Sequence, residues 1–460
     1  MKSIYIKVLS IFVTYQICFL LWHIINNSTS NQQIDLITTK SASIPLKLTS
    51  ATNFPNVKTH KPIEIQGNKT INPLPAIANK IITSDSEVKQ ISYRLEPFTM
   101  KLPNFFDNDS RHWFVNSTYY RMYSKKCLNN NCELYGFYYN NSKEHLDVHI
   151  AFVNKGVYHN DLCGFGYNEK AFRRSFLSKT DVSVVYDEIL IYTVPDGWSF
   201  QHFLDGIGPK LSHSRKYLDL YPNSKVLIIR GLRFDRSVKE IWKLLGVDES
   251  NRIIHYNPPL KIGANLLINP CRTPATHPSL WQNARDIYWS FINKTNSKSN
   301  LLIYLQRTRS NAKNPGRIIL NEQVVIDYLR NFAKKKSLVY VQYDHSNHIE
   351  NIQSQIELFS RAKIIFGIHG GALSNINFAQ SNTFIIEIMP FRQDKPSLPI
   401  VCANSDPNLL QPCVGYIYYV QSQLLNQSYW ILPTVVDKKS NVNVNMTKLD
   451  LLFNSLSIQN

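Results

Sequence analysis

The sequence has few acidic residues and no dense block of basic ones. Its 51 lysines and arginines against 33 aspartates and glutamates give a formal net charge of +18 over 460 residues. The positive charges are scattered, and the longest block, Lys334–Lys336, is typical of the solvated end of a helix. No RNA- or DNA-binding motif is present. The charge therefore favours an anionic membrane surface or an acidic small molecule over nucleic acid as the partner.

The cysteines lack the spacing of a metal site. No C-x-x-C pair is present, and no histidine lies at a spacing that would complete a zinc site. One of the seven, Cys18, lies in an apolar N-terminal run, and the other six follow it. Close spacing predicts two local disulfides and leaves one further pair: Cys127/Cys132, Cys402/Cys413 and Cys163/Cys271. Disulfides indicate an oxidising compartment, with a zinc site as the alternative.

Residues 8–25 form an apolar run just long enough to cross a bilayer. Lys2 and Lys7 precede it and no charge follows until Asp35, an asymmetry that predicts a cytoplasmic N-terminus and a luminal remainder. A cleaved signal peptide is the alternative, but the small residues of a cleavage site are absent and Trp22–Ile25 is bulky. The sequence thus predicts a signal-anchor of a single-pass type II protein in the membrane of the endoplasmic reticulum or Golgi.

Composition divides the chain after the anchor (residues 1–25) into three parts. Residues 26–95 are rich in Asn, Ser, Thr, Pro and Lys with little periodicity, which predicts a stem. Two α/β blocks follow, residues 96–295 and 296–460. Potential N-glycosylation sites are absent from residues 298–425, the most regular part of the chain, as expected if glycans need accessible loops.

The apolar runs in the two blocks are continuous rather than alternating, which indicates parallel strands covered on both faces. The predicted strands are 188–194, 225–229 and 252–256, then 301–305, 338–343, 363–368 and 383–388. The predicted helices are 200–211 with a break at Gly208-Pro209, 237–245 with a capping box of Ser237 and Glu240, 321–335 and 349–361. This alternation predicts an α/β fold of two Rossmann-like lobes with a cleft between them.

The most informative segment is the sequence IIFGIHGGALSN at residues 364–375, followed by FIIEI at residues 384–388. Two buried strands with a glycine-rich crossing fit this pattern. Glycines let the backbone approach the phosphates of a nucleotide, and His369 and Glu387 lie near strand ends, where open α/β sheets bind ligands. The alternative is a hydrogen-bonded core histidine beside a tight turn.

Several segments in a fixed order resemble glycosyltransferase family 61. The resemblance covers residues 185–390, and the matching segments are densest from residue 301 on. They are Arg307-x-Arg309, Arg317–Glu322, Gly367–Asn375 and Ile386–Ile388, with Gln201–Leu211 upstream similar to the family's His-aromatic-x-Asp and Pro-x-Leu segment. The family includes EGF-domain O-linked N-acetylglucosaminyltransferases, protein O-mannose N-acetylglucosaminyltransferases and plant β-1,2-xylosyltransferases. One departure is that Gly371 and Ala372 exchange places relative to the family's His-Gly-Ala-Gly.

The resemblance implies a GT-B-like enzyme that transfers a sugar from a UDP-sugar with inversion. The second block is then expected to bind the donor and the first block the acceptor. We expect UDP-N-acetylglucosamine as the donor, with UDP-xylose as the alternative, and a glycoprotein or glycan as the acceptor. A non-catalytic luminal lectin-like or scaffold protein with the same fold stays open, because of the Gly371–Ala372 exchange.

Six residues are predicted to bind the donor: Arg307, His369, Gly370, Gly371, Asn375 and Glu387. A planar, always charged guanidinium at a strand end suits the diphosphate. The glycines can offer backbone N–H groups at the start of the next helix, and the histidine can bind a phosphate or a sugar hydroxyl. The asparagine is expected to hold the loop, and the glutamate to bind ribose hydroxyls. The nearby charges Arg309, Lys313 and Arg317 are predicted to be solvated loop residues.

His202 and Asp205 are the predicted catalytic residues, since they lie three apart on one helical face and an acceptor hydroxyl needs a base. Either could be the base while the other orients it, and an ordinary pair at a helix N-terminus is the alternative. Asp107-Asn-Asp109 has the D-x-D form of a manganese site, but no predicted strand precedes it. We therefore expect no required metal or other cofactor, with the charge of the leaving group neutralised by protein cations.

Overall fold

The computed structural model describes residues 64–458. The segments outside the description within that range are 66–68, 71–75, 82–87, 96–97, 99, 117–130, 133–145, 160–181, 183, 230, 232, 258–259, 271–276, 293–298, 308–315, 345–350 and 400–416. The predicted anchor lies outside the described part of the chain, and so does at least one cysteine of each predicted disulfide. Among the helices that are described, none is long and apolar enough to cross a bilayer.

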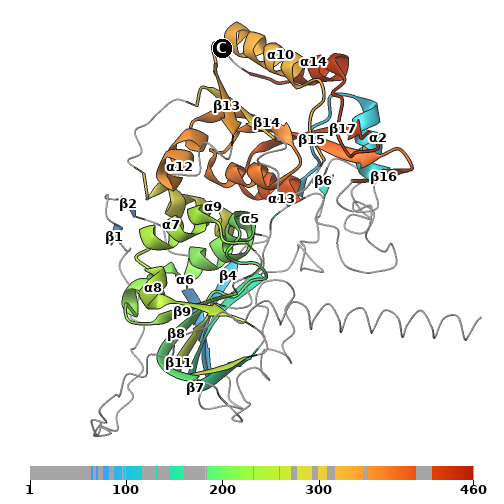
Figure 1. Cartoon of the computed structure of the whole chain (residues 1–460). Coiled ribbons are helices and arrows are strands. Elements are labelled where there is room, and N and C mark those ends of the chain that lie inside the picture. The colour runs from blue at the N-terminus through green and yellow to red at the C-terminus, as the bar shows by residue number, and fades with distance from the viewer. Residues whose placement is uncertain are drawn as a thin grey trace, which may run out of the picture. The chain divides into compact units, whose positions relative to one another are not determined.

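The first sheet has parallel strands on one side and antiparallel strands on the other (Figure 1). Its order is β10 (Ile253–Tyr256), β9 (Lys225–Ile229), β8 (Val184–Ile191), β11 (Lys261–Asn269), β7 (Leu146–His159), β4 (Val88–Leu95) and β3 (Ala76–Ile81). The first four are parallel, and β11 pairs with β7, β7 with β4 and β4 with β3 in antiparallel fashion. The three strands predicted in this block, β8, β9 and β10, are parallel as expected, and the antiparallel strands extend the sheet beyond them. The sheet begins within the segment that composition assigned to the stem.

The helical segment after β8 is continuous where a break was predicted. It comprises α5 (Phe200–His202), the π-helix η1 (Phe203–Ile207) and α6 (Gly208–Leu220). Pro209 stands at the start of α6, directly after the π-helix, and the helical segment continues through it. The extra backbone residue of the π-helix alters which side chains face the neighbouring elements, and such turns occur often at functional sites.

Helix α7 (Arg236–Leu244) begins at Asp235, so the predicted capping box of Ser237 and Glu240 is wrong. Glu240 instead accepts a hydrogen bond from the backbone N–H of Ile352, at the start of α12 (Ile352–Ser360). The carboxylate that looked like a local cap therefore makes a contact between residues 112 positions apart. Helices α8 (Glu249–Arg252) and α9 (Pro278–Trp289) complete the first block.

The second sheet is doubly wound. Its parallel strands are β13 (Val339–Asp344), β12 (Leu301–Gln306), β14 (Ala362–Ile368), β15 (Phe384–Arg392) and β17 (Ser428–Val435), with β16 (Lys395–Pro399) antiparallel to the end of β15. Counted in chain order, the parallel strands follow the sequence 2-1-3-4-5. In sheets of this order the chain connections diverge between strands 1 and 3, and ligands bind at the carboxyl ends there. Here that place lies between β12 and β14.

Helices cover both faces of the second sheet. On one face, α10 (Glu322–Lys335) lies beside α14 (Met446–Asn454) (Figure 1). The ring centroids of Phe332 and Phe453 are 4.8 Å apart, and Phe453 also contacts Phe366 of β14. The other face is covered by α12, the 3-10 helix η2 (Gly371–Phe378) and α13 (Ile417–Leu424). The predicted strands and helices of this block are all present, which supports a Rossmann-like α/β fold.

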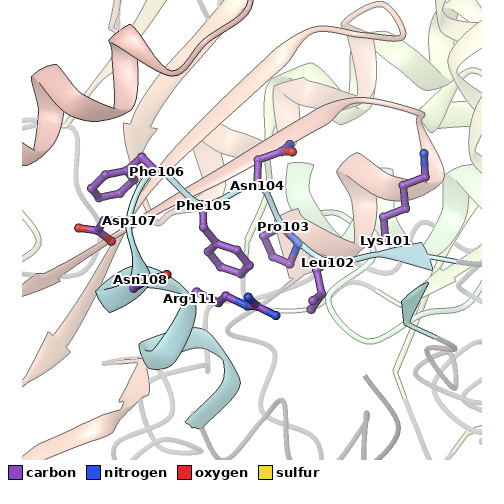
Figure 2. A pocket seen from close by; sticks show the side chains of 9 residues that line it. All are labelled: Lys101, Leu102, Pro103, Asn104, Phe105, Phe106, Asp107, Asn108 and Arg111. Carbon is purple, nitrogen blue, oxygen red and sulfur yellow. The ribbon is translucent and has the colours of Figure 1, made fainter. Parts of the chain in front are cut away.

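Residues 100–116 pack on the second sheet, although domain prediction assigned them to the first block. The segment contains β5 (Met100–Lys101), which pairs with β6 (Asn131–Cys132), and α2 (Asn108–Asn116). The N–H of Asn104 donates to the carbonyl of Tyr429 at 2.8 Å, and the hydroxyl of Tyr419 donates to the carbonyl of Lys101 at 2.5 Å. A surface pocket of about 650 Å³, lined by residues 101–108 and Arg111, lies along this segment (Figure 2).

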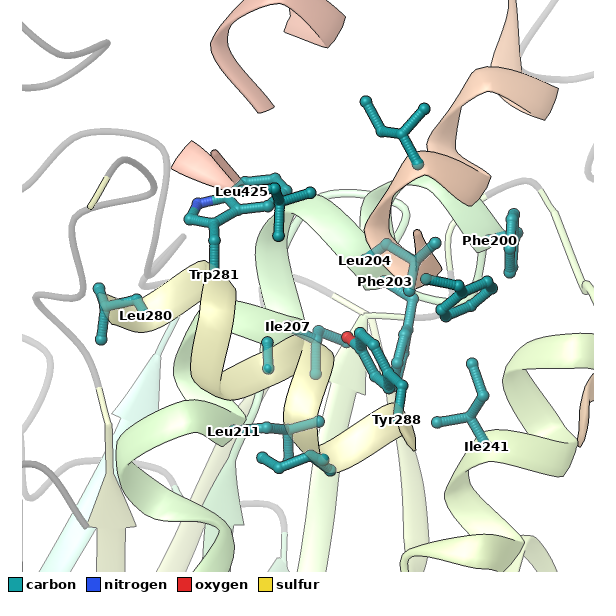
Figure 3. Packing of buried hydrophobic residues seen from close by; sticks show 14 of the residues in the cluster. Phe200, Phe203, Leu204, Ile207, Leu211, Ile241, Leu280, Trp281, Tyr288 and Leu425 are labelled. Carbon is teal, nitrogen blue, oxygen red and sulfur yellow. The ribbon is translucent and has the colours of Figure 1, made fainter. Parts of the chain in front are cut away.

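A single hydrophobic cluster joins the two sheets. Figure 3 shows part of it, in which Tyr288 and Trp281 of α9 lie among apolar side chains of α5, η1 and α6. Tyr288 also contacts Phe378 of η2, with ring centroids 5.4 Å apart. Arg285 of α9 is buried and donates to the carbonyls of Ala379 and Leu425 in the second block. The described residues thus show a packed junction between the two blocks.

Replacing Arg285 with alanine should lower the free energy of unfolding by about 2–3 kcal/mol, because it leaves two buried carbonyls short of a donor. The measurement is chemical denaturation of the purified chain. Arg392→Ala is the matched control, since Arg392 is exposed and pairs with the exposed Asp394. A surface pair of this kind should contribute less than about 1 kcal/mol. Equal losses in the two variants would contradict the role given to Arg285.

Candidate active site

The candidate site lies at the carboxyl ends of β12 and β14, where the connections of the second sheet diverge. Arg307 follows β12 directly, and His369 follows β14 directly. Glu387 stands opposite Gly367 in the pairing of β14 with β15. Arg307 and His369 come where their buried apolar strands end, whereas Glu387 lies within β15. The structure therefore brings together the predicted residues of both motifs.

Glu387 has no exposed surface and lies between two buried donors. Its Oε1 is 2.5 Å from Nδ1 of His369, and its Oε2 accepts a hydrogen bond from the hydroxyl of Tyr429 at 2.5 Å. An unpaired buried carboxylate would be very unfavourable, and these two contacts offset its desolvation. Since both oxygens are engaged, the predicted contact with ribose hydroxyls has no exposed oxygen available. In this arrangement Glu387 holds the ring of His369 and leaves Nε2 to face other partners.

Two arginines meet beside His369. Arg307 donates from Nε to the carbonyl of Gly316 at 3.2 Å, and Arg317 donates to the carbonyl of His369 at 3.0 Å. Burial, and then the charge of Arg317, lowers the pKa of Arg307 to about 10, and burial also lowers the pKa of Arg317. Both remain charged at neutral pH. The prediction that Arg317 is a solvated loop residue is wrong, because its backbone turns it inward.

That turn is strained. Gly316 has φ +86° and Arg317 has φ +59°, a left-handed conformation that is uncommon for a residue with a side chain. The N–H of Arg317 donates to the carbonyl of Ser440 at 2.6 Å, which helps to hold the conformation. Left-handed residues of this kind cluster at ligand sites, where the surrounding structure maintains the strain. Here the strain places a second guanidinium next to the first.

Tyr418 connects the groups of the site. This buried residue of α13 contacts His369, with ring centroids 5.3 Å apart. Burial raises the pKa of Tyr418, and the charges of Glu387 and Asp205 raise it further, while Arg317 opposes them. Tyr418 is thus within electrostatic range of residues from both blocks.

The glycine loop is compatible with the exchange at residues 371 and 372. Gly370 has an extended backbone, and neither Gly371 nor Ala372 has a positive φ. A Cβ at residue 371 would meet only Oε1 of Gln201, at 3.8 Å, whereas one at residue 370 would lie 3.2 Å from a nitrogen of Arg307. The exchange of Gly371 and Ala372 therefore puts no strain on the backbone of the loop. The position at which an added side chain would come close to Arg307 is Gly370.

Asn375 is buried within η2 and is held from two sides. Its Nδ2 donates to the carbonyl of Ala372 at 2.8 Å, and its Oδ1 accepts from Gln355 of α12 at 2.5 Å. These contacts suit the predicted part of Asn375 in holding the loop rather than in touching a ligand. The predicted helix after the glycines is a 3-10 helix, so its first-turn N–H groups are arranged more tightly than in an α-helix.

His202 and Asp205 lie together at the other side of the site. Nδ1 of His202 is 3.7 Å from Oδ1 of Asp205, which is 8 % exposed and has no hydrogen-bond partner at that oxygen. Burial would lower the pKa of His202, but the Asp205 carboxylate outweighs it and the pKa is raised. The neighbouring Gln201 lies close to Gly371, which places α5 against the glycine loop.

The D-x-D segment has other partners. Asp107 accepts a hydrogen bond from the N–H of Ser110 at 2.7 Å in the first turn of α2, and both Asp107 and Asp109 lie within ion-pair distance of Lys448. These aspartates therefore cap a helix and join it to α14. No cluster of three or more His, Cys, Asp or Glu side chains that could hold a metal occurs among the described residues.

Residues 200–386 match the family model described as glycosyltransferase 61. This segment belongs to glycosyltransferase family 61. The segment runs from α5 to β15 and contains His202, Asp205, Arg307 and His369, which the structure groups at one place. The resemblance stated from the motifs is confirmed, and a glycosyltransferase implies a sugar donor and an acceptor. No curated protein matches the chain.

Three residues of the candidate site were not predicted or were predicted wrongly: Tyr418, Tyr429 and Arg317. Tyr429 is 42 positions from its partner Glu387, so no local pattern connects them. Tyr418 and Tyr429 belong to α13 and β17, elements for which no prediction was made. For Arg317 a signal was present in the Gly316–Arg317 pair, since glycine often accompanies a tight left-handed turn.

Glu387→Gln should lower the free energy of unfolding by about 1–3 kcal/mol, because an amide cannot accept from both His369 and Tyr429. Equilibrium denaturation measures the change. Glu357→Gln, at an exposed position of α12, is the control and should stay within about 0.5 kcal/mol. A Glu387→Gln chain as stable as the control would show that the buried hydrogen bonds add no net stability.

Proposed function

We propose that this chain is an inverting glycosyltransferase that moves a sugar from a UDP-sugar to a glycoprotein or glycan acceptor in the secretory pathway. The carrying observation is the pair of adjacent arginines, Arg307 and Arg317, at the ligand-binding end of the second sheet. Two partly buried cations repel each other, and a bound diphosphate would relieve that repulsion with charge-assisted hydrogen bonds. The family match supports the reaction class.

In the proposed reaction the acceptor hydroxyl attacks the anomeric carbon of the donor from the face opposite UDP. The new C–O bond forms as the bond to the diphosphate breaks, and His202 takes the proton of the hydroxyl. Asp205 faces Nδ1 of His202, so Nε2 is the atom left for the acceptor, and the carboxylate stabilises the imidazolium that forms. UDP departs as an anion held by the arginines, without need of a metal in this scheme.

The remaining residues hold the donor site in place. Gly370 permits close approach of a phosphate beside Arg307, while Glu387 orients His369 from within the sheet. We propose UDP-N-acetylglucosamine as the donor and UDP-xylose as the alternative. The membrane anchor, the luminal orientation and residence in the Golgi or endoplasmic reticulum are part of the same proposal, supported by the charge asymmetry around residues 8–25.

Thermal melting of the full-length chain with UDP, UDP-N-acetylglucosamine, UDP-xylose and GDP tests the donor assignment. A ligand that binds only the folded state adds about 2.7 kcal/mol at a hundredfold excess over its dissociation constant. UDP and one UDP-sugar should raise the melting temperature, and Arg307→Ala should weaken that binding roughly ten- to a hundredfold, since hydrogen bonds to charged groups contribute about 1.5–3 kcal/mol.

Arg330→Ala is the matched control, because Arg330 is exposed and lies on α10 away from the loop. No shift with any nucleotide, or equal binding by Arg307→Ala and Arg330→Ala, would contradict the donor site. UDP-sugar binding with neither transfer nor hydrolysis would favour the non-catalytic lectin-like alternative. Hydrolysis of a UDP-sugar that Arg307→Ala abolishes would exclude that alternative.

The pH dependence of kcat/KM tests the base. His202 must be neutral to accept a proton, so activity should rise with pH through its pKa, which Asp205 and Asp196 raise and Arg233 lowers. Asp205→Asn removes the largest raising charge, so the rising limb should move to lower pH, while kcat falls by at least about tenfold. Asp327→Asn, at an exposed position, should leave the profile unchanged. A limb that stays in place in Asp205→Asn would exclude His202 as the base.

A further inference from the structure

Tyr288 of α9 carries a buried hydroxyl that has no hydrogen-bond partner among the described residues. Two more buried atoms of the first block share this property within the described part of the chain: Nδ1 of His202 in α5 and Oδ1 of Asp205 in η1. Buried polar atoms without a partner are unfavourable, and in native proteins they are usually bonded to ordered water. The three atoms therefore call for a common explanation if they lie close together.

Gly208 brings the hydroxyl of Tyr288 against the helical segment that carries Asp205. A Cβ at residue 208 would clash with that hydroxyl, and it would lie 3.6 Å from Cζ of Tyr288 and 3.7 Å from Cβ of Ala284. The absence of a side chain at Gly208 is thus what allows α9 to approach so closely. Gly208 follows Asp205 by three residues, where the π-helix passes directly into α6. Figure 3 shows the ring of Tyr288 extending from α9 toward this segment.

The charge of Asp205 acts on the same hydroxyl. Burial, and then the negative charge of Asp205, raises the pKa of Tyr288. The hydroxyl therefore keeps its proton at neutral pH and can donate it toward a carboxylate. The other charged or titratable groups in electrostatic contact with His202, with Asp205 or with their neighbours are Asp196, Arg233, Tyr418, Glu387 and Arg317.

We propose that Tyr288 is a positioning residue of the His202–Asp205 pair, whose hydroxyl donates to the Asp205 carboxylate through one bridging water. The inference rests on the proposed function, in which His202 is the base, and deepens it by naming the group that sets the strength of that base. A bridging water would satisfy the hydroxyl of Tyr288 and Oδ1 of Asp205 together, since no direct hydrogen bond joins these two described residues.

The consequence for the base follows from sharing the carboxylate. A hydrogen bond donated to Asp205 draws negative charge away from the side that faces Nδ1 of His202. His202 then binds a proton less tightly than it would beside a carboxylate without that donor. A base works best when it is neutral at the working pH and still able to accept a proton, so this moderation favours catalysis.

Tyr288→Phe should make His202 bind its proton roughly three- to tenfold more tightly, because the carboxylate without its donor attracts the imidazolium more strongly. The measurement is NMR titration of the ¹⁵N-labelled histidines in the purified full-length chain. The His202 signal is identified by its loss in His202→Gln. The titration midpoint of that signal should move to higher pH in Tyr288→Phe.

Tyr192→Phe is the matched control. It also removes a buried hydroxyl from the first block, but that hydroxyl pairs with Ser214 at 2.8 Å. The titration of His202 should stay unchanged in this variant. A midpoint that does not rise in Tyr288→Phe, or that rises equally in Tyr192→Phe, would overturn the inference.

Gly208→Ala tests the close approach independently. The added methyl group should lower the midpoint of chemical denaturation, because it meets the hydroxyl of Tyr288. The same substitution should cause a smaller loss in a Tyr288→Phe background, where the clashing oxygen is gone and Cζ is 3.6 Å away. Equal losses in the two backgrounds would contradict the contact and with it the inference.

The pH dependence of kcat/KM in the same variants separates this inference from the proposed function. The rising limb should follow the titration of His202 and move to higher pH in Tyr288→Phe, opposite to the shift expected for Asp205→Asn. A raised titration midpoint with an unmoved limb would support the role of Tyr288 and exclude His202 as the base. A limb that follows His202 in the unchanged chain, with a midpoint that stays in place in Tyr288→Phe, would overturn the role of Tyr288 and leave the base.

Discussion

The buried carboxylate of Glu387 is the constraint on which the candidate site depends. A charge in the middle of a parallel sheet is tolerated only with matched donors, and His369 and Tyr429 supply them from the two adjacent strands. The three residues join three strands: His369 follows β14, Glu387 lies within β15, and Tyr429 is near the start of β17. Because the ring of His369 is then fixed, its carbonyl can serve as the acceptor for Arg317. The two hydrogen bonds of Glu387 inside the sheet thereby help to position the guanidinium of Arg317 at the end of the sheet.

The second block was predictable because most of its strands are continuous apolar runs, and the first two strands along the chain are each followed by an amphipathic helix. Burial on both faces imposes that pattern, and the structure reproduces every predicted element there. The first block was harder. Its strands β7 and β11 contain Asn, Lys and Gly between apolar residues, so they do not form the continuous apolar runs by which the other strands were predicted. Glu240 is a similar case. The local sequence pattern predicted that it caps its own helix, but it accepts a hydrogen bond from the distant Ile352 instead.

The residues of the candidate site also divide into those that the sequence predicted and those that only the fold reveals. Glycine, histidine and arginine at strand ends are visible in the sequence, because the ligand-binding end of an α/β sheet is set by local order along the chain. The partners that fix them are not visible. Tyr429 acts across 42 positions and Tyr418 comes from a helix after an undescribed segment, so only packing brings them to His369. The sequence thus indicates which groups could bind a ligand, and the fold decides which of them are free to do so.

The junction between the two sheets bears on how such a site would operate. Two Rossmann-like lobes lead one to expect an open cleft that closes on substrate. The described residues instead form one hydrophobic cluster across the junction, with Arg285 and Trp289 of α9 donating to backbone carbonyls of the second block. Separating the blocks would expose that cluster and leave those carbonyls unpaired. The spacing between His202 and the arginines is therefore set by packing, which is how a preorganised site lowers the reorganisation needed in the transition state.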